Sequence, residues 1–252
     1  MAVELALTPD IRWTAGLGEQ VDAARGAGFM SLGIFAAQAG EQAEKMFRAR
    51  GLGCHEVLAL VISDNEDATL AAAQRAAAAA DVMAAPWVTT VFHAPLTATT
   101  PRLVARCAAA MGEAGARMAV EFHPFGPVTS IGAGLEVVET AGFGAGLLID
   151  TWHFFLGDST WADLQEVAID RIAYIQFDDA PHPESEDLLG ETMNRRVLPG
   201  DGTFDLDRFA ATLLGRGFDG VVSVEVLSQQ LLALPVREVA RLSYRAAARY
   251  WG

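Results

Sequence analysis

The sequence MAVEF (Met118–Phe122) is followed, after a helix-like segment, by LLIDTW (Leu147–Trp152). Each is a short apolar run that carries a carboxylic acid near its end. The intervening segment Leu135–Gly142 has apolar residues at three- and four-residue spacing, which is typical of a helix with one buried face. A buried strand, a helix and a second buried strand predict a parallel βαβ unit with a right-handed crossover.

The same rhythm extends along the whole chain. Helix-like segments separate eight apolar runs, and the clearest of these segments are Asp67–Met83, Arg102–Gly115, Asp205–Gly217 and Val236–Tyr250. The runs are Val3–Leu7, Phe29–Phe35, Glu56–Val61, Val88–Phe92, Met118–Phe122, Leu147–Trp152, Ile172–Phe177 and Val221–Val226. Eight such units in 252 residues predict one (β/α)₈ TIM barrel domain over residues 1–252, because this fold typically needs about 250 residues.

Glycines mark the predicted helix ends. Gly28, Gly51 and Gly217 each stand between a helix-like segment and the next apolar residue, which is typical of a left-handed helix terminus. The alternative to a barrel is an open, doubly wound sheet. That fold normally has a glycine-rich phosphate loop after its first strand, and residues Thr8–Trp13 do not form one.

The charge balance excludes several classes of partner. Lys and Arg number 18 against 32 Asp and Glu, giving a net charge of −14. Nucleic acids and anionic membranes attract basic surfaces, so we expect neither as a partner and expect a small molecule instead. The two cysteines, Cys54 and Cys107, lack the spacing of a disulfide scaffold or thiolate zinc site. No signal peptide or membrane-spanning run is evident, which favours a cytoplasmic enzyme.

Polar residues end four consecutive strands of the predicted barrel. They are Glu121, Asp150, Gln176 and Glu225, each among apolar neighbours. The carboxyl ends of barrel strands meet at the catalytic face, where three converging carboxylates would repel one another. A divalent cation between them resolves that repulsion, and oxygen ligands favour Mn²⁺ or Mg²⁺, with Co²⁺ as a substitute. The alternative is that each residue has its own hydrogen bond or arginine.

Other polar residues are candidates for contacting a substrate. His153 follows Asp150 by three residues, and we expect it to reach over the site from a loop. His93 also follows a strand, whereas His55 stands at the start of one and should lie at the opposite face or on the flank. Residues 178–202 are expected to form a long polar loop in which either Arg195 or Arg196 could bind a ligand, the other being a solvated charge pair.

These motifs together resemble the xylose isomerase-like TIM barrel superfamily, which includes sugar phosphate isomerases and epimerases. The resemblance rests on Val120–Phe125, Leu148–His153, Ile175–Ala180, Arg196–Gly202 and Ser223–Val226. It implies that Glu121, Asp150, Gln176 and Glu225 hold one divalent ion per chain and that His153 and Arg196 contact the substrate. The family often has His where Gln176 stands, but hydroxypyruvate isomerase and some dehydroshikimate dehydratases look similar in using Gln.

The resemblance implies an enzyme that removes a proton from a carbon next to a carbonyl. Glu121 and Glu225 would exchange that proton on opposite faces of a sugar or keto-polyol through a metal-stabilised enediolate, giving an isomerase or epimerase. A dehydratase acting on a 3-dehydroshikimate- or keto-inositol-like substrate would use the same residues. A non-catalytic accessory subunit is a third interpretation. Family members are often dimers or tetramers, so a homo-oligomer is compatible with the resemblance.

Overall fold

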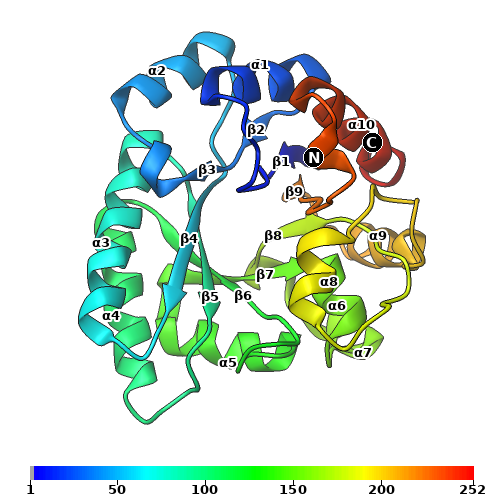
Figure 1. Cartoon of the computed structure of the whole chain (residues 1–252). Coiled ribbons are helices and arrows are strands. Elements are labelled where there is room, and N and C mark those ends of the chain that lie inside the picture. Colours follow the sequence, from blue (N-terminus) through cyan, green and yellow to red (C-terminus); the bar gives the residue numbers. More distant parts are fainter. Residues whose placement is uncertain (1–2) are drawn as a thin grey trace.

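The computed structural model describes residues 3–252 and contains one nine-stranded parallel sheet surrounded by helices (Figure 1). Around the ring, the order is β2-β1-β9-β8-β7-β6-β5-β4-β3. The strands are β1 (Glu4–Leu7), β2 (Ser31–Leu32), β3 (Ile34–Phe35), β4 (Glu56–Ile62), β5 (Trp87–Phe92), β6 (Arg117–Glu121), β7 (Ala145–Asp150), β8 (Ile172–Phe177) and β9 (Val221–Val224).

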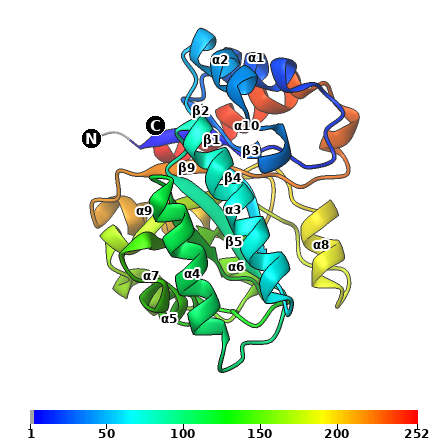
Figure 2. The same cartoon turned by 90° about the vertical axis from the view of Figure 1, so that its left-hand side faces the viewer.

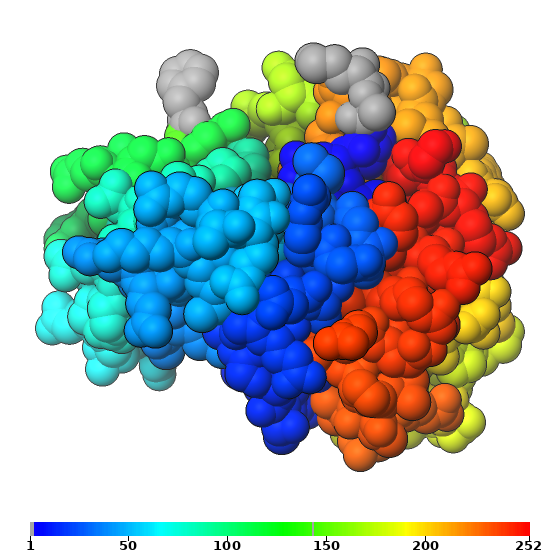
Figure 3. Space-filling model, turned by 90° about the horizontal axis from the view of Figure 1, so that it is seen from above, coloured from blue at the N-terminus to red at the C-terminus, as the bar shows by residue number. Residues whose placement is uncertain are grey.

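Helices follow the strands and most of them cover the outer face of the sheet, while α8 stands apart from this outer layer (Figure 2). They are α1 (Leu17–Ala27), α2 (Glu41–Arg50), α3 (Glu66–Met83), α4 (Thr100–Glu113), α5 (Ile131–Ala141), α6 (Thr151–Leu156), α7 (Trp161–Glu166), α8 (Leu188–Asn194), α9 (Leu206–Gly215) and α10 (Val236–Trp251). The last helix packs along the first, so the two ends of the chain lie side by side (Figure 3). None of the helices among residues 3–252 combines the length and the apolar character that a membrane crossing requires.

The prediction of a TIM-barrel fold is confirmed. The ring of hydrogen-bonded strands is continuous except at Gly33, between β2 and β3. The run predicted as one strand, Phe29–Phe35, is divided at Gly33 into β2, which pairs with β1, and β3, which pairs with β4. A Cβ atom at Gly33 would lie 2.6 Å from Oε1 of Glu56. The interruption therefore leaves room for a buried carboxylate inside the barrel.

The Glu56 carboxylate is held by hydroxyl groups from other strands. It is fully buried and accepts hydrogen bonds from Thr8, Tyr174 and Thr89, the last at 2.7 Å. Burial acts to raise the pKa of Glu56, but His55 and the hydroxyl groups of Thr8 and Tyr174 outweigh it and lower the pKa. His55 lies at the N-terminal ends of the strands, as predicted, and lines a cavity of ≈ 580 Å³ there.

Two predicted strands end earlier than the sequence suggested. The run Leu147–Trp152 was expected to be extended throughout, but β7 ends at Asp150 and Trp152 belongs to α6. The reason is local: the Asp150 carboxylate caps α6, and Ser, Asp and similar residues at this position start helices. Likewise β9 ends at Val224, so Glu225 lies just beyond the strand rather than within it.

Gly33→Ala tests the packing of the barrel interior. We expect it to lower the free energy of unfolding by about 1–3 kcal/mol, because the added methyl group would overlap a carboxylate fixed by its hydrogen bonds. Gly26→Ala is the control, since Gly26 lies in α1 with no neighbour within 4 Å, and it should raise stability by about 0.5–1 kcal/mol. Urea denaturation measures both; a Gly33→Ala midpoint equal to that of the wild type would contradict this packing.

Candidate active site

The four residues predicted to share a site stand at the same end of the barrel. Glu121 ends β6, Asp150 ends β7, Gln176 is the last residue but one of β8, and Glu225 follows β9. Asp150 and Gln176 are partners in the register of the two strands. Glu121, Gln176 and Glu225 line a cavity of ≈ 270 Å³, just below the ~300–1,000 Å³ typical of small-molecule sites.

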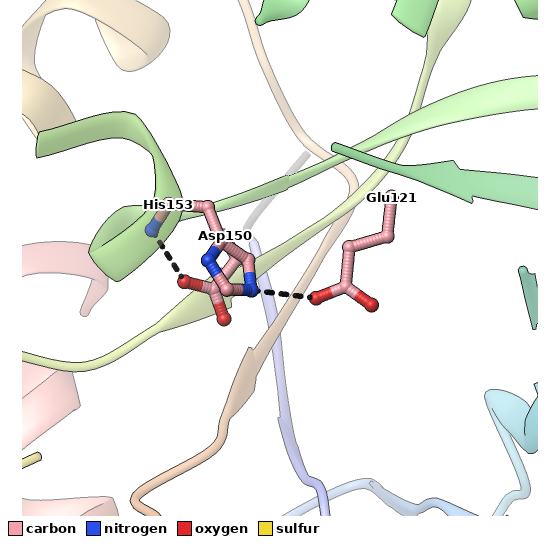
Figure 4. Close-up of side chains that lie close together, drawn as sticks. All are labelled: Glu121, Asp150 and His153. Atoms are coloured by element: carbon pink, nitrogen blue, oxygen red, sulfur yellow. Dashed lines mark hydrogen bonds and ion pairs between the residues drawn. The ribbon is translucent and has the colours of Figure 1, made fainter. Parts of the chain in front are cut away.

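A candidate metal site is formed by Glu121, Asp150 and His153. Each of these buried residues offers a ligand atom within 4.8 Å of the other two. Oδ1 of Asp150 accepts a hydrogen bond from the backbone N–H of His153 at 3.0 Å, and Nε2 of His153 lies 3.2 Å from Oε1 of Glu121 (Figure 4). The sequence placed His153 in a loop; it lies instead in the first turn of α6, and the Asp150 cap fixes its position.

Gln176 supplies the observation that fits a bound cation. Its side chain is 1% exposed, and its Oε1 atom has no hydrogen-bond partner among the described residues. An unpaired buried amide oxygen costs free energy, whereas a metal ion accepts such an oxygen as a ligand. The donor set of two or three carboxylates, one amide and one imidazole therefore suits a divalent ion.

Arg196 occupies the space between the carboxylates. Its Nη1 atom lies 2.7 Å from Oδ2 of Asp150 and 3.3 Å from Oε2 of Glu225, and it also contacts Asp178. Nε and Nη2 donate to Oγ1 of Thr192 at 3.0 and 2.8 Å. In this arrangement one guanidinium supplies the positive charge that three carboxyl groups share.

The sequence offered Arg195 and Arg196 for two roles, a ligand contact and a solvated charge pair, and the surroundings of the two side chains differ. Arg195 is partly exposed and forms ion pairs with Glu184 at 2.6 Å and Glu191 at 2.8 Å. It is the solvated charge pair. Arg196 is 2% exposed and lines the cavity, and its contact with a substrate stays a prediction.

Burial governs the protonation of the carboxyl groups around Arg196. It raises the pKa of Asp178 and of Glu225 well above the ordinary carboxyl range, even though Arg196 opposes the change. Burial also acts to raise the pKa of Asp150, but Arg196 and His153 outweigh it and lower the pKa. The charge of this cluster therefore depends on pH and on any cation that joins it.

Three histidine rings stand in a row along the cavity wall. The ring centroids of His93 and His123 are 5.9 Å apart, and those of His123 and His153 are 5.8 Å apart. Burial, with the two neighbouring imidazoles, lowers the pKa of His123 to about 4. His93 lines the cavity, as its candidacy for substrate contact requires, and that contact stays a prediction.

Sequence reasoning missed two contributors to the site. Asp178 directly follows β8 and is fully buried, yet no role was assigned to it. Helix α8 lies in the segment expected to be irregular, and it brings Leu189, Thr192 and Met193 to the cavity. Two signals in the sequence were available: the acidic pair Asp178-Asp179 pointed to the buried acid, and Asp187, which caps α8, pointed to the helix.

The raised pKa values predict how pH affects stability. In EDTA, Asp178 and Glu225 hold more protons in the folded chain than in the unfolded chain above about pH 4. The stability that these two groups contribute at low pH is therefore lost as pH rises through their raised pKa. A divalent ion should offset that loss. We expect MnCl₂ to raise Tm by at least about 3 °C more at pH 8 than at pH 5. An equal gain at both pH values would contradict this, and exposed Asp170→Asn should behave as the wild type does.

Comparison with known proteins identifies the family of the chain and agrees with the barrel fold. The family model of the xylose isomerase-like TIM barrel matches residues 21–249. A solved structure described as the IOLI protein with a bound zinc atom covers 99% of this chain and is covered in full, with a TM-score of 0.88 and 18% identity. That similarity shows the fold.

Curated relatives match over part of the chain. An inosose isomerase of Halalkalibacterium halodurans is 32% identical over 130 residues, which are 50% of this chain and 45% of that protein. A 3-dehydroshikimate dehydratase of Pseudomonas aeruginosa is 32% identical over 92 residues, or 36% of this chain and 14% of that protein. The chain thus spans half or less of the length of these relatives. With a family model that matches nearly its whole length, the chain belongs to the xylose isomerase-like TIM barrel family.

Proposed function

We propose that this chain is a divalent-metal-dependent isomerase or epimerase of a sugar or keto-polyol. The supporting observation is that Glu121 and Glu225 face one cavity from the first and last of four consecutive strand ends. Two carboxyl groups on opposite flanks of a bound substrate can act on its opposite faces. One removes a proton from the carbon next to the carbonyl, and the other returns a proton to the product.

The metal would be held by Glu121, Asp150, Gln176 and Glu225, with the nitrogen of His153 close by. When bound, the ion would polarise the substrate carbonyl and stabilise the negative charge that develops on it. The oxygen donors support Mn²⁺ or Mg²⁺. The nitrogen of His153 among the candidate ligands, and the zinc of the IOLI structure, support Zn²⁺ as a second candidate, and Co²⁺ suits the same donors.

His153 and Arg196 would orient the substrate. Nε2 of His153 lies 3.2 Å from Oε1 of Glu121, so its single N–H can donate either to that carboxylate or to a substrate oxygen beside it. Arg196 remains fixed by Thr192 through two N–H groups while its Nη1 side faces the carboxylates. These contacts would hold the reacting carbon within reach of a carboxyl oxygen.

A dehydratase is the second candidate. It is favoured by the similarity to a 3-dehydroshikimate dehydratase and to an inosose dehydratase of Bacillus licheniformis, which is 32% identical over 98 residues. In that reaction one glutamate would remove the proton next to the carbonyl. The other would protonate a β-hydroxyl group, which leaves as water while a carbon–carbon double bond forms.

Metal analysis tests the ligand set. We expect the purified chain to bind about one Mn²⁺, and Glu225→Gln to weaken the affinity at least about 10-fold, because a ligand charge is lost. Exposed Glu136→Gln on α5 removes the same charge away from the cavity and should leave the affinity unchanged. Unchanged occupancy in Glu225→Gln would count against the proposed site.

Hydrogen exchange tests the reaction. The Mn²⁺-loaded chain should incorporate deuterium from D₂O next to the carbonyl of a ketose or keto-cyclitol without losing water. At saturating metal, Glu121→Gln should slow this exchange at least about 100-fold, because the acid–base group is removed. Water loss with a new enone absorption in the ultraviolet would identify the dehydratase. Absence of reaction across ketoses, keto-cyclitols and 3-dehydroshikimate would refute both enzymes.

A further inference from the structure

The charge of Arg196 is neutralised within the protein. Its Nη1 atom contacts Asp150, Asp178 and Glu225, and the side chain is almost completely buried. Three carboxyl groups therefore surround one guanidinium. Any ligand that used Arg196 as its counter-charge would compete with side chains that are already in place.

No other permanent cation faces the cavity. Arg196 is the only Arg or Lys among the described residues that line the cavity. The other basic side chains in its wall are His93, His123 and His153. Glu121 and Glu225 line the same space. A carboxylate or phosphate group on a ligand would be desolvated beside these acids with no free basic side chain to pair with, and a bound ion would already share its charge with its carboxylate ligands. Binding of such a group is therefore unfavourable.

Asp178 is the acid left to compensate the charge of Arg196 when a metal binds. Asp150 and Glu225 are proposed metal ligands, so an ion would draw both away from the guanidinium. Asp178 does not line the cavity; it lies behind Arg196, fully buried, and Oδ1 of Asp178 accepts a hydrogen bond from the Thr151 hydroxyl at 2.6 Å. It remains the partner of Arg196 whether or not the ion is present.

The rest of the wall suits the uncharged faces of a ring. Leu58, Val91, Leu189, Met193 and Leu227 supply aliphatic surface to the same cavity. C–H groups of a cyclic polyol can pack there while its hydroxyl groups meet the polar side. Both parts of the wall therefore favour a neutral ligand.

We propose that Asp178 is a specificity-determining residue that makes this cavity select uncharged ketoses and keto-cyclitols over carboxylated or phosphorylated ones. This inference rests on the proposed function, because it concerns the substrate of the same site. The inference distinguishes the inosose isomerases from the 3-dehydroshikimate dehydratases among the relatives. A neutral keto-cyclitol fits the charge of the cavity, and a keto acid such as 3-dehydroshikimate does not.

The test compares ligands that differ in charge and do not react. Calorimetric titration of the Mn²⁺-loaded chain should show myo-inositol binding at least about 10-fold more tightly than shikimate, with inorganic phosphate as the third probe. Asp178→Asn should reduce this preference at least about 10-fold, because Arg196 becomes available to an anion. Exposed Asp170→Asn removes the same formal charge and should leave the preference unchanged.

A double variant separates the role of Arg196 from general electrostatics. Asp178→Asn combined with Arg196→Gln should reject shikimate as the wild type does. If the double variant accepts shikimate as well as Asp178→Asn does, the proposal is overturned. If the single variant does not fold, the wild type decides alone: shikimate or phosphate binding as tightly as myo-inositol overturns the inference.

The outcomes for the reaction and for selectivity are distinguishable. Deuterium exchange in carboxylated but not in neutral substrates would overturn the inference and leave a proton-transferring enzyme in place. If metal and exchange are both absent, the proposed function fails. The titrations of the wild type repeated in EDTA then still decide the ligand preference of the cavity, because all three carboxyl groups stay beside Arg196 without the ion.

Discussion

Acidic side chains gathered at one end of a closed parallel sheet need positive charge among them. The barrel brings the ends of β6 to β9 to one place, and with them Glu121, Asp150 and Glu225. Asp178 adds a fourth acid directly after β8. Arg196 supplies one positive charge from within the chain, and the side-chain oxygen of Gln176, which has no partner among the described residues, is where we propose that a cation adds more. The geometry, protonation and proposed chemistry of the site all depend on this balance.

The same balance links catalysis to selectivity. Two glutamates that exchange protons with a substrate must stay close to it without repelling it. A neutral polyol meets this condition, since its hydroxyl groups can donate to carboxylates and bind a cation through oxygen. In the proposed function, the aliphatic part of the cavity wall, to which α8 contributes, would pack against the C–H groups of the ring.

Much of the barrel could be predicted because buried parallel strands read as apolar runs. Ile172–Phe177 has the predicted bounds, and the strand-end position of Glu121 and Asp150 followed from the pattern. What the pattern misses is set by single side chains in three dimensions. The division at Gly33 depends on Glu56, which lies 23 residues further along the chain, and the helical position of His153 depends on a cap. The Arg196 contacts join three separate strand ends, which no local sequence signal indicates.

Asp150 uses its two oxygens for different tasks. Oδ1 starts α6 by accepting the His153 N–H, while Oδ2 faces Arg196. A change at this position therefore disturbs the backbone that carries the imidazole as well as the local charge. During divergence of the family, exchange of this acid for most other residues would displace two functional groups at once. Asparagine keeps the capping oxygen but turns an NH₂ group toward Arg196, so it would preserve the start of α6 while removing both the charge and the ion pair.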